Sequence, residues 1–477
     1  MCRSFHSCVI PTIQDTRHRE RIFILRIRWE EGNSQSSRVI AIGLMLFALF
    51  FGAGNLIFPS SMGQNAGYNV WWSVLGFIIS GVGLPLAGVL AMGYSGCEDL
   101  RQLASRVGLK YGLVFSVVVY LTIGPWFCIP RTGSVSYEIA VRPFLNSGGS
   151  DMEMMAFLVL FFIISYWLSA NPSKLVDRIG KILTPCLLLT IVMLILKSYL
   201  TPMGVPQAPT AHYATASMAA VQGFIDGYGT MDAMGSFVFA ILVIKFVKEN
   251  GADTPQKVTR DVFKAGLLAA ACLGFVYVFI ADLGATSVQA LGILETGAPV
   301  LANSAQILFG SAGALLLAVI VLLACLSTSI GLLTSCATFF NEIYDRISYT
   351  AYLRGFTIVS FLIGTFGLLT IIKTAIPVLM FLYPLTVATI FLTFMHNVFN
   401  GNRIVYISTI GFTCFSALIS GLETAGVPLG ALSDVMNTYV PFQAIGLGWI
   451  IFALTGFIAG LIAAAILKKP ETVPDEV

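Results

Sequence analysis

Apolar runs follow one another along almost the whole chain from residue 39 onward, and short stretches rich in charge, glycine and proline separate them. Runs of about 18 or more apolar residues are typical of transmembrane α-helices, because a helix needs about 20 residues to cross the core of a bilayer. The alternating segments typical of membrane β-barrels do not occur in the sequence. The pattern predicts twelve spans, near residues 39–60, 72–94, 112–140, 154–170, 180–199, 219–247, 262–284, 309–340, 353–371, 375–396, 404–421 and 442–467.

Composition agrees with this pattern. The 477 residues are 57% hydrophobic and 11% charged, and the mean hydropathy is +0.85, whereas a soluble protein carries about 25% charged residues. We therefore expect an all-α polytopic protein embedded in a lipid bilayer. The formal charge of +3 is too small to indicate a nucleic-acid partner, and the nine scattered cysteines form no metal or disulfide motif.

The sequence contains no P-loop, GxSxG or HExxH motif, so we expect neither an enzyme nor a catalytic residue. No cofactor and no obligate protein partner are predicted. Residues 1–38 form a basic segment without the features of a signal peptide. We interpret this segment as a disordered or interfacial cytoplasmic tail, with a start codon assigned too far upstream and a lipid-binding role as alternatives.

The distribution of Lys and Arg predicts the orientation, because cytoplasmic loops carry an excess of both. With the N-terminus in the cytoplasm, the connections on that side hold sixteen of these residues, and the opposite side holds four. Both termini, including the short tail 469–477, are therefore predicted to be cytoplasmic. The outer segment 292–310 is too short to span the membrane and is expected to form a lid-like surface loop.

Two spans contain clusters of residues that disfavour helix. Glycine costs about 1 kcal/mol and proline about 3 kcal/mol in a helix interior. The first span has Gly52, Gly54, Asn55 and Pro59, and the sixth has Gly223, Gly227, Gly229 and Gly235 together with Asp226 and Asp232. Broken helices at positions 1 and 6 indicate an inverted five-helix repeat. The predicted repeats are 39–200 and 219–398, followed by two further spans in 403–468.

A broken helix exposes backbone groups at membrane depth, which is tolerated where they face protein or a wet cavity. The N-terminus of the second half-helix suits a carboxylate, and the freed carbonyls suit a cation. The alternative is a packing face of small residues, although packing alone does not require Asn55 and Pro59.

A band of hydroxyls lies in the eighth span, and hydroxyl oxygens are suitable ligands for a hard cation. The alternative is that each hydroxyl bonds to a carbonyl of its own helix, which we favour for the last two members. The band consists of Ser327, Thr328, Ser329, Thr334 and Ser335.

Five motifs in this order resemble the bacterial branched-chain amino acid:cation symporters, the LIVCS family: "FALFFGAGNLIFP", "GVGLPLAGVLAM", "GPWFCIPRTGSVSYE", "GYGTMDAMGSFVF" and "LSTSIGLLTSCATFF". The likeness covers roughly residues 39–468. It implies twelve transmembrane helices, the leucine-transporter fold, a bacterial inner-membrane location, and uptake of leucine, isoleucine and valine driven by a sodium or proton gradient.

The resemblance also implies a sodium site between the first break and the eighth helix. Its expected ligands are the carbonyls of Ala48, Phe51 and Cys325 and the hydroxyls of Thr328 and Ser329, with Cys325 in place of the family's alanine. Some members of the fold bind a second sodium through asparagines of helices 1 and 7. Asn55 matches the first, but the seventh span has no asparagine, so one coupling cation is expected.

The substrate is expected between the two breaks, in an apolar pocket. One methylene contributes only about 1–3 kcal/mol to discrimination, so overlapping acceptance of leucine, isoleucine and valine is expected. The candidate substrate residues are Phe51, Gly52, Ala53, Gly54, Asn55, Gly229, Thr230, Met231, Asp232 and Leu333.

Charges inside spans are functional candidates. Asp232 is the strongest, for the substrate ammonium or the cation. Arg131 and Glu138 lie seven residues apart, hence on one helix face, and are interpreted as structural partners of other helices or as gating or coupling residues. A same-fold transporter of another small neutral solute is the alternative function. A channel is disfavoured because no filter motif is visible.

Overall fold

The computed structural model describes residues 38–145, 149–171, 184–249 and 254–467, and every regular element in these ranges is helical. Nine of the described helices are long and apolar enough to cross a membrane, and two shorter apolar helices are Arg38–Phe50 and Thr184–Leu200. Both predicted tails, except Arg38, and the start of the fifth predicted span at 180–183 lie outside the described residues, as do the loop cations Lys174, Arg178 and Lys181.

The first half of the chain begins with the Arg38–Phe50 helix, which ends at an abrupt break. After the break come α2 (Ala53–Ala66), η1 (Gly67–Asn69), α3 (Val70–Ile78), η2 (Ile79–Gly83), α4 (Leu84–Ser95), α5 (Leu100–Ala104), α6 (Leu109–Leu121), η3 (Thr122–Trp126), α7 (Cys128–Ala140), η4 (Arg142–Phe144), α8 (Asp151–Ser169) and α10 (Thr184–Leu200). The third predicted span is thus interrupted at η3, where Gly124 has non-helical dihedral angles and Pro125 follows. Proline removes a backbone donor and crowds the preceding turn, which explains the kink.

The second half begins with another broken helix. This broken helix consists of α11 (Ala216–Asp226), η8 (Gly227–Thr230) and α12 (Asp232–Glu249), and η7 (Ala211–Tyr213) precedes it. The elements that follow are α13 (Pro255–Leu291), α14 (Gly297–Phe309), α15 (Ser311–Ile343), α16 (Tyr349–Gly364), α17 (Leu368–Met395), η9 (His396–Phe399), α18 (Arg403–Thr424), α19 (Ala431–Tyr439), η10 (Gln443–Ile445) and α20 (Trp449–Leu467).

The lid-like loop expected at 292–310 is mostly helix α14, so that expectation was wrong. The buried positions Val300, Leu301, Ser304, Ala305 and Leu308 repeat with helical spacing, and this periodicity favours a helix lying on the protein surface. The apolar face packs against α15 and α2. Gly297 allows the close approach, because a Cβ there would lie 1.9 Å from the carbonyl oxygen of Ile57.

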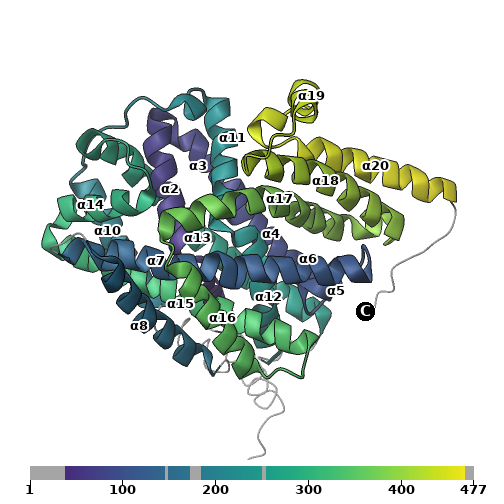
Figure 1. Cartoon of the computed structure of the whole chain (residues 1–477), viewed down its shortest axis with the longest axis horizontal. Helices are drawn as coiled ribbons and strands as arrows, with labels where there is room; N and C mark the ends of the chain where they lie inside the picture. Colours follow the sequence, from purple (N-terminus) through teal and green to yellow (C-terminus); the bar gives the residue numbers. More distant parts are fainter. Residues whose placement is uncertain (1–37, 146–148, 172–183, 250–253, 468–477) are drawn as a thin grey trace, which may run out of the picture.

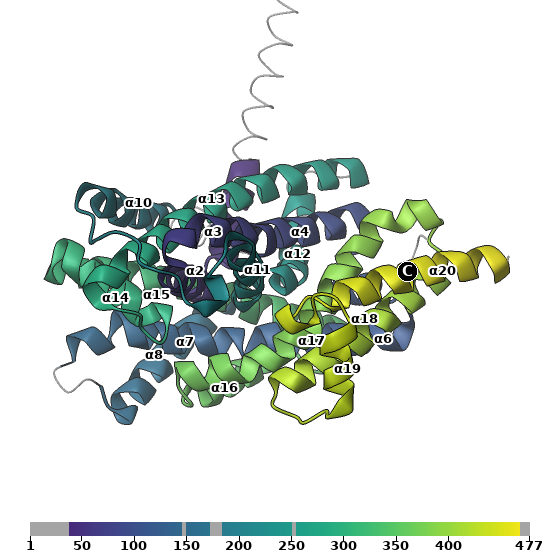
Figure 2. The same cartoon turned by 90° about the horizontal axis from the view of Figure 1, so that it is seen from above.

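The two broken helices occupy the centre of the molecule. In the most apolar stretch of the segment Ala216–Glu249, 94% of residues are buried, compared with 11% in α20 at the periphery. α2 packs against α13 and α14, α4 packs against α12, and α7 packs against α15. Figures 1 and 2 show α18, α19 and α20 together on one side of this assembly.

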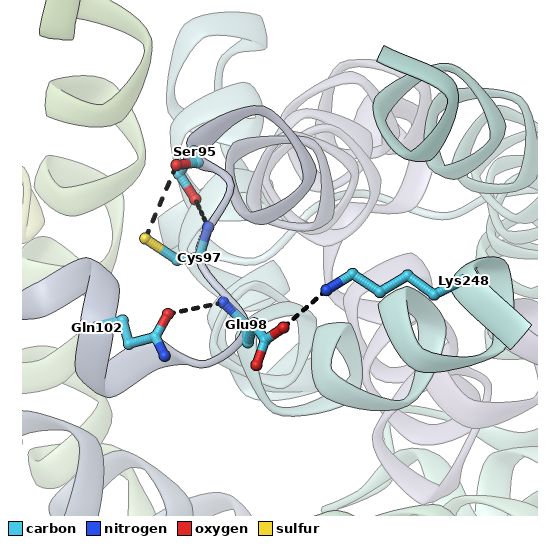
Figure 3. Close-up of polar contacts among 5 residues, drawn as sticks. All are labelled: Ser95, Cys97, Glu98, Gln102 and Lys248. Atoms are coloured by element: carbon cyan, nitrogen blue, oxygen red, sulfur yellow. Dashed lines mark hydrogen bonds and ion pairs between the residues drawn. The ribbon is translucent and has the colours of Figure 1, made fainter. Parts of the chain in front are cut away.

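A polar contact joins the α4–α5 connection to the end of α12. Lys248 Nζ lies 2.7 Å from Glu98 Oε1, and the Glu98 N–H donates to Gln102 Oε1 over 3.0 Å (Figure 3). Both charged side chains are well exposed, and exposed ion pairs contribute only about 0–1 kcal/mol. The pair therefore orients the α4–α5 connection more than it stabilises the fold.

Candidate functional site

The first break lies between the Arg38–Phe50 helix and α2. The Phe51 N–H still donates to the carbonyl of Phe47 over 2.7 Å, whereas Gly52 has extended dihedral angles. The Gly52 N–H donates to Asn55 Oδ1 over 3.1 Å, so Asn55 caps the start of α2. The chain changes direction here, and the Asn55 side chain supplies the partner that the Gly52 N–H would otherwise lack.

Glycines at this break permit close contacts with two other helices. A Cβ on Gly52 would lie 2.7 Å from Thr328 Oγ1 of α15, and a Cβ on Gly54 would lie 2.6 Å from Arg131 Nη2 of α7. Both separations are too short for a side chain. The structure therefore requires small residues here to bring α15 and α7 against the backbone of the break.

The second break consists of η8 and Met231, which joins η8 to α12. Met231 is buried and adopts the left-handed conformation with φ 67°, a conformation that costs about 1–3 kcal/mol for a residue other than glycine. The Thr230 hydroxyl donates to the carbonyl of Gly227 over 2.9 Å, and the Asp232 N–H donates to the same hydroxyl over 3.3 Å. This strained turn sets Asp232 at the start of α12.

Oxygen atoms gather where α15 meets the end of the first half-helix. Ser327 Oγ donates to the Ala48 carbonyl over 2.8 Å, and Thr328 Oγ1 donates to the Leu49 carbonyl over 2.9 Å and lies 3.5 Å from that of Ala48. All four residues are buried. A buried cluster of hydroxyl and carbonyl oxygens has the chemistry of a site for a hard monovalent cation.

The other predicted cation ligands lie around this cluster. The Ser329 hydroxyl turns to α8, where it lies 3.3 Å from Ser165 Oγ. Phe51 stacks its ring on Phe47 with ring centres 5.2 Å apart, and Cys325 is fully buried one turn before Ser329. The structure thus brings Thr328 and Ala48 together directly, with Leu49 and Ser327 as additional neighbours.

A second polar cluster joins three helices through Asp232. The Asn55 side-chain amide of α2 donates to Asp232 Oδ2 and to the Tyr277 hydroxyl of α13. The Tyr277 hydroxyl donates to Asp232 Oδ2 over 3.1 Å. All three side chains are at most 5% exposed, and the N-terminus of α12 adds its dipole. The carboxylate is held by neutral donors, and among the described residues no basic side chain forms an ion pair with it.

Arg131 projects from α7 to the second break. Its Nη1 donates to the Gly229 carbonyl over 2.7 Å, and its Nη2 donates to the Thr230 carbonyl over 3.3 Å. The guanidinium lies 5.6 Å from the centre of the Phe58 ring, a distance at which a cation is attracted to the ring face. Arg131 therefore connects α7 with both broken helices.

Glu138 lies apart from this contact. Its Oε2 pairs with Arg142 Nη1 over 2.7 Å at the end of α7, where both side chains are partly exposed. Although Arg131 and Glu138 have helical spacing, Arg131 lies at the breaks and Glu138 lies at the partly exposed end of α7.

The remaining predicted residues are both buried: Ala53 lies next to Gly54 at the first break, and Leu333 lies on α15, one turn beyond Ser329. Sequence reasoning missed Tyr277, Phe58, Leu49 and Ser165. Tyr277 carries a hydroxyl within the apolar seventh span, and this signal could have found it.

Comparison with known sequences gives a family match over residues 35–467, to the family described as branched-chain amino acid transport protein. The chain is 44% identical over 434 residues to the branched-chain amino acid permease BrnQ of Bacillus subtilis, covering 91% of this chain and 98% of that protein. It is 36% identical over 432 residues to the branched-chain amino acid transport system 2 carrier protein of Pseudomonas aeruginosa, covering 91% and 97%.

Solved structures with the same fold include Mhp1, a nucleobase-cation-symport-1 family transporter, with a TM-score of 0.62, 14% identity and coverage of 92% of this chain and 94% of that one. MhsT in complex with L-phenylalanine gives a TM-score of 0.54 at 15% identity, with coverage of 89% and 98%. At these identities the likeness concerns the fold alone. The predicted leucine-transporter-like architecture with broken helices 1 and 6 is confirmed.

Proposed function

The chain belongs to the branched-chain amino acid transport protein family, whose members are transporters and not enzymes, and from this premise we propose that it imports leucine, isoleucine and valine. The proposed mechanism is symport with a monovalent cation, with sodium favoured, through alternating access. The proposed location is the bacterial inner membrane, with both termini in the cytoplasm, as the distribution of Lys and Arg indicates.

The meeting of the two breaks supports an amino acid as the substrate. The first amides of a helix lack backbone partners within the helix. The Gly52 N–H is already paired with Asn55, so the amides that follow it at the start of α2 suit the substrate carboxylate. Asp232 is a buried carboxylate held by neutral donors, and it suits the ammonium group. Buried apolar residues such as Phe51 and Leu333 suit a branched aliphatic side chain.

The observation that carries the cation proposal is the contact of Thr328 with the carbonyls of Leu49 and Ala48. A cation held there would bridge α15 to the same break that holds the substrate carboxylate. Binding of either would then favour binding of the other, because coupling between two sites is reciprocal. Proton coupling through Asp232 is the alternative, and the lack of an ion pair to its carboxylate among the described residues supports it.

Arg131 is a candidate for coupling the breaks to the rest of the protein. It contacts the second break through two carbonyls and the first through Phe58, while its own helix packs against α15. If the broken helices moved relative to α7, these contacts of Arg131 would have to break and others would have to form.

Uptake of labelled leucine into proteoliposomes tests the proposed substrate class. We expect excess unlabelled isoleucine or valine to suppress uptake, and excess glutamate or lysine to have no effect, because a dry pocket rejects a charged side chain. If glutamate or lysine competed as well as isoleucine, the proposed substrate class would be wrong.

A further inference from the structure

A groove runs along the surface between α8 and α16. α8 and α16 are in contact, and Figures 1 and 2 show them side by side at the edge of the molecule. The groove encloses about 450 Å³ and is lined by Val159, Phe162, Ile163, Tyr166, Arg354, Thr357, Ile358 and Phe361.

The walls of the groove are apolar and face outward. Ile163 of α8 is 59% exposed and Ile358 of α16 is 58% exposed, whereas Phe162 is 2% exposed and forms the floor. In a membrane-spanning protein, such exposed aliphatic side chains face lipid chains rather than water. The apolar lining of the groove fits a hydrocarbon chain.

One end of the groove is polar and positively charged. Arg354 Nε donates to the Tyr166 hydroxyl over 3.2 Å, so the guanidinium is held at the mouth of the groove. Within the described part of the chain, its two terminal nitrogens form no hydrogen bond or ion pair. They remain available to an anion from outside the protein.

Aromatic residues mark this end as the level of the lipid headgroups. Trp167 follows Tyr166 and is 66% exposed, and tryptophan and tyrosine are enriched at the interface between membrane and water. The same end is the predicted cytoplasmic end, where basic pockets between transmembrane helices bind anionic headgroups.

We propose that this groove binds one anionic phospholipid of the inner leaflet. The phosphate contacts the terminal nitrogens of Arg354, whose planar fork matches two phosphate oxygens. An acyl chain lies over Phe162 between Ile163 and Ile358. This proposal is independent of which substrate or cation the protein carries. Because α8 and α16 both pack against α7 and α15, the bound lipid also stabilises the part of the protein that holds Arg131 and Thr328.

Binding of defined lipids to the purified full chain in detergent, measured by native mass spectrometry, tests the proposal. We expect the wild type to bind phosphatidylglycerol more tightly than phosphatidylcholine with the same acyl chains. Arg354→Gln should weaken phosphatidylglycerol binding about fivefold, the factor expected for one basic residue near the membrane surface, and should remove the preference. Arg346→Gln is the matched control, because Arg346 is exposed in the preceding connection and does not line the groove.

A second variant tests the hydrocarbon part of the site. Ile358→Trp fills the groove with an apolar side chain and leaves Arg354 in place, so binding of both lipids should fall. Both variants should unfold near the wild-type temperature without added lipid, since neither position is buried. A preference for phosphatidylglycerol that survives Arg354→Gln, or lipid binding unchanged in Ile358→Trp, would overturn the proposal.

Discussion

Thr328 illustrates how single residues of this protein connect separate helices. Its hydroxyl leaves α15 to reach the Leu49 carbonyl, and the absence of a side chain at Gly52 makes room for it. Asn55 has a similar position on the other side of the break, where it caps its own helix and contacts Asp232 and Tyr277. Substitutions at these positions are therefore expected to affect binding more than folding.

Thr328→Ala is expected to weaken sodium binding without disturbing α15, because alanine keeps the helix and removes one oxygen. A polar contact to a charged group contributes about 1.5–3 kcal/mol, so the apparent sodium affinity should fall about tenfold or more. Sodium dependence of leucine binding by the purified variant measures this effect. Thr334→Ala, which removes a buried hydroxyl elsewhere on α15, is the control. Equal activation of Thr328→Ala and wild type by sodium would contradict the assignment.

Gly54→Leu is expected to abolish leucine binding while the protein still inserts into the membrane. The new Cβ would lie 2.6 Å from Arg131 Nη2 and 3.2 Å from Thr230 Cα. The leucine side chain would therefore separate the first break from Arg131 and from the second break. Gly235→Ala is the control, because its Cβ would make only ordinary contacts at 3.6 Å or more. Near-normal leucine binding by well-expressed Gly54→Leu would show that this glycine serves packing alone.

Asp232→Asn separates the two forms of coupling. The substitution preserves size and removes the charge that the Asn55 amide and the Tyr277 hydroxyl contact. If Asp232 binds the substrate ammonium or shapes the cation site, leucine exchange should weaken at every pH, which is the outcome we expect. Retained exchange with loss of accumulation driven by a pH gradient would instead identify Asp232 as the proton carrier. Asp282→Asn is the control, because it removes a partly exposed carboxylate from the neighbouring helix α13 and leaves Asp232 of α12 in place.

At the scale of elements, close helix contacts depend on small residues. α3 and α11 approach so closely that a Cβ on Gly223 would lie 2.1 Å from the carbonyl oxygen of Ser73, and one on Gly76 would lie 1.8 Å from that of Ala220. This reciprocal contact brings α11, the first half of the second broken helix, against α3, which follows the first broken helix.

Gly223→Leu is therefore expected to destabilise the protein, since overpacking costs about 1–3 kcal/mol. Gly274→Leu on α13 is the matched control, because nothing lies within 4 Å of its Cβ position. Thermal unfolding in detergent should show a lower midpoint for Gly223→Leu alone. The two variants unfolding at the same temperature would argue against tight α3–α11 packing as a source of stability.

The sequence predicted elements well where the pattern was strong and local. Apolar runs located the spans, and the clusters around Gly52 and Gly229 located both breaks. The kink at Gly124 and Pro125 was missed because it lies inside a continuous apolar run. The helix α14 was missed because its length suggested a loop, although its apolar residues have helical spacing.

The candidate site was predictable only in part, because its contacts join residues far apart in the chain. Motif resemblance indicated Thr328 and Asp232, but no local pattern shows that Tyr277 meets Asp232 or that Arg131 reaches the carbonyl of Gly229. Such pairings depend on how helices cross, which the hydrophobic pattern of each span does not determine. For Arg131 and Glu138, the helical spacing correctly predicted that both lie on one face of a helix. It did not predict that Arg131 contacts the second break while Glu138 pairs with Arg142.

For the whole molecule, two breaks, one oxygen cluster and one carboxylate are proposed to act together in a single transport cycle. The substrate and the cation are proposed to share the first break, and Arg131 connects the breaks to α7. Since the formal charge of the substrate amino acid is zero, cotransport with one cation moves one positive charge per cycle. A membrane potential that is negative inside should therefore increase uptake.

An ion gradient is proposed to drive leucine uptake through the site at Thr328. The most direct measurement is accumulation of labelled leucine in proteoliposomes that contain the wild-type chain, with a sodium gradient and a pH gradient imposed separately at the same membrane potential. We predict that an inward sodium gradient alone drives accumulation above the external concentration and that a pH gradient without sodium does not. Accumulation driven by the pH gradient and insensitive to sodium would contradict the sodium site and leave Asp232 as the coupling residue.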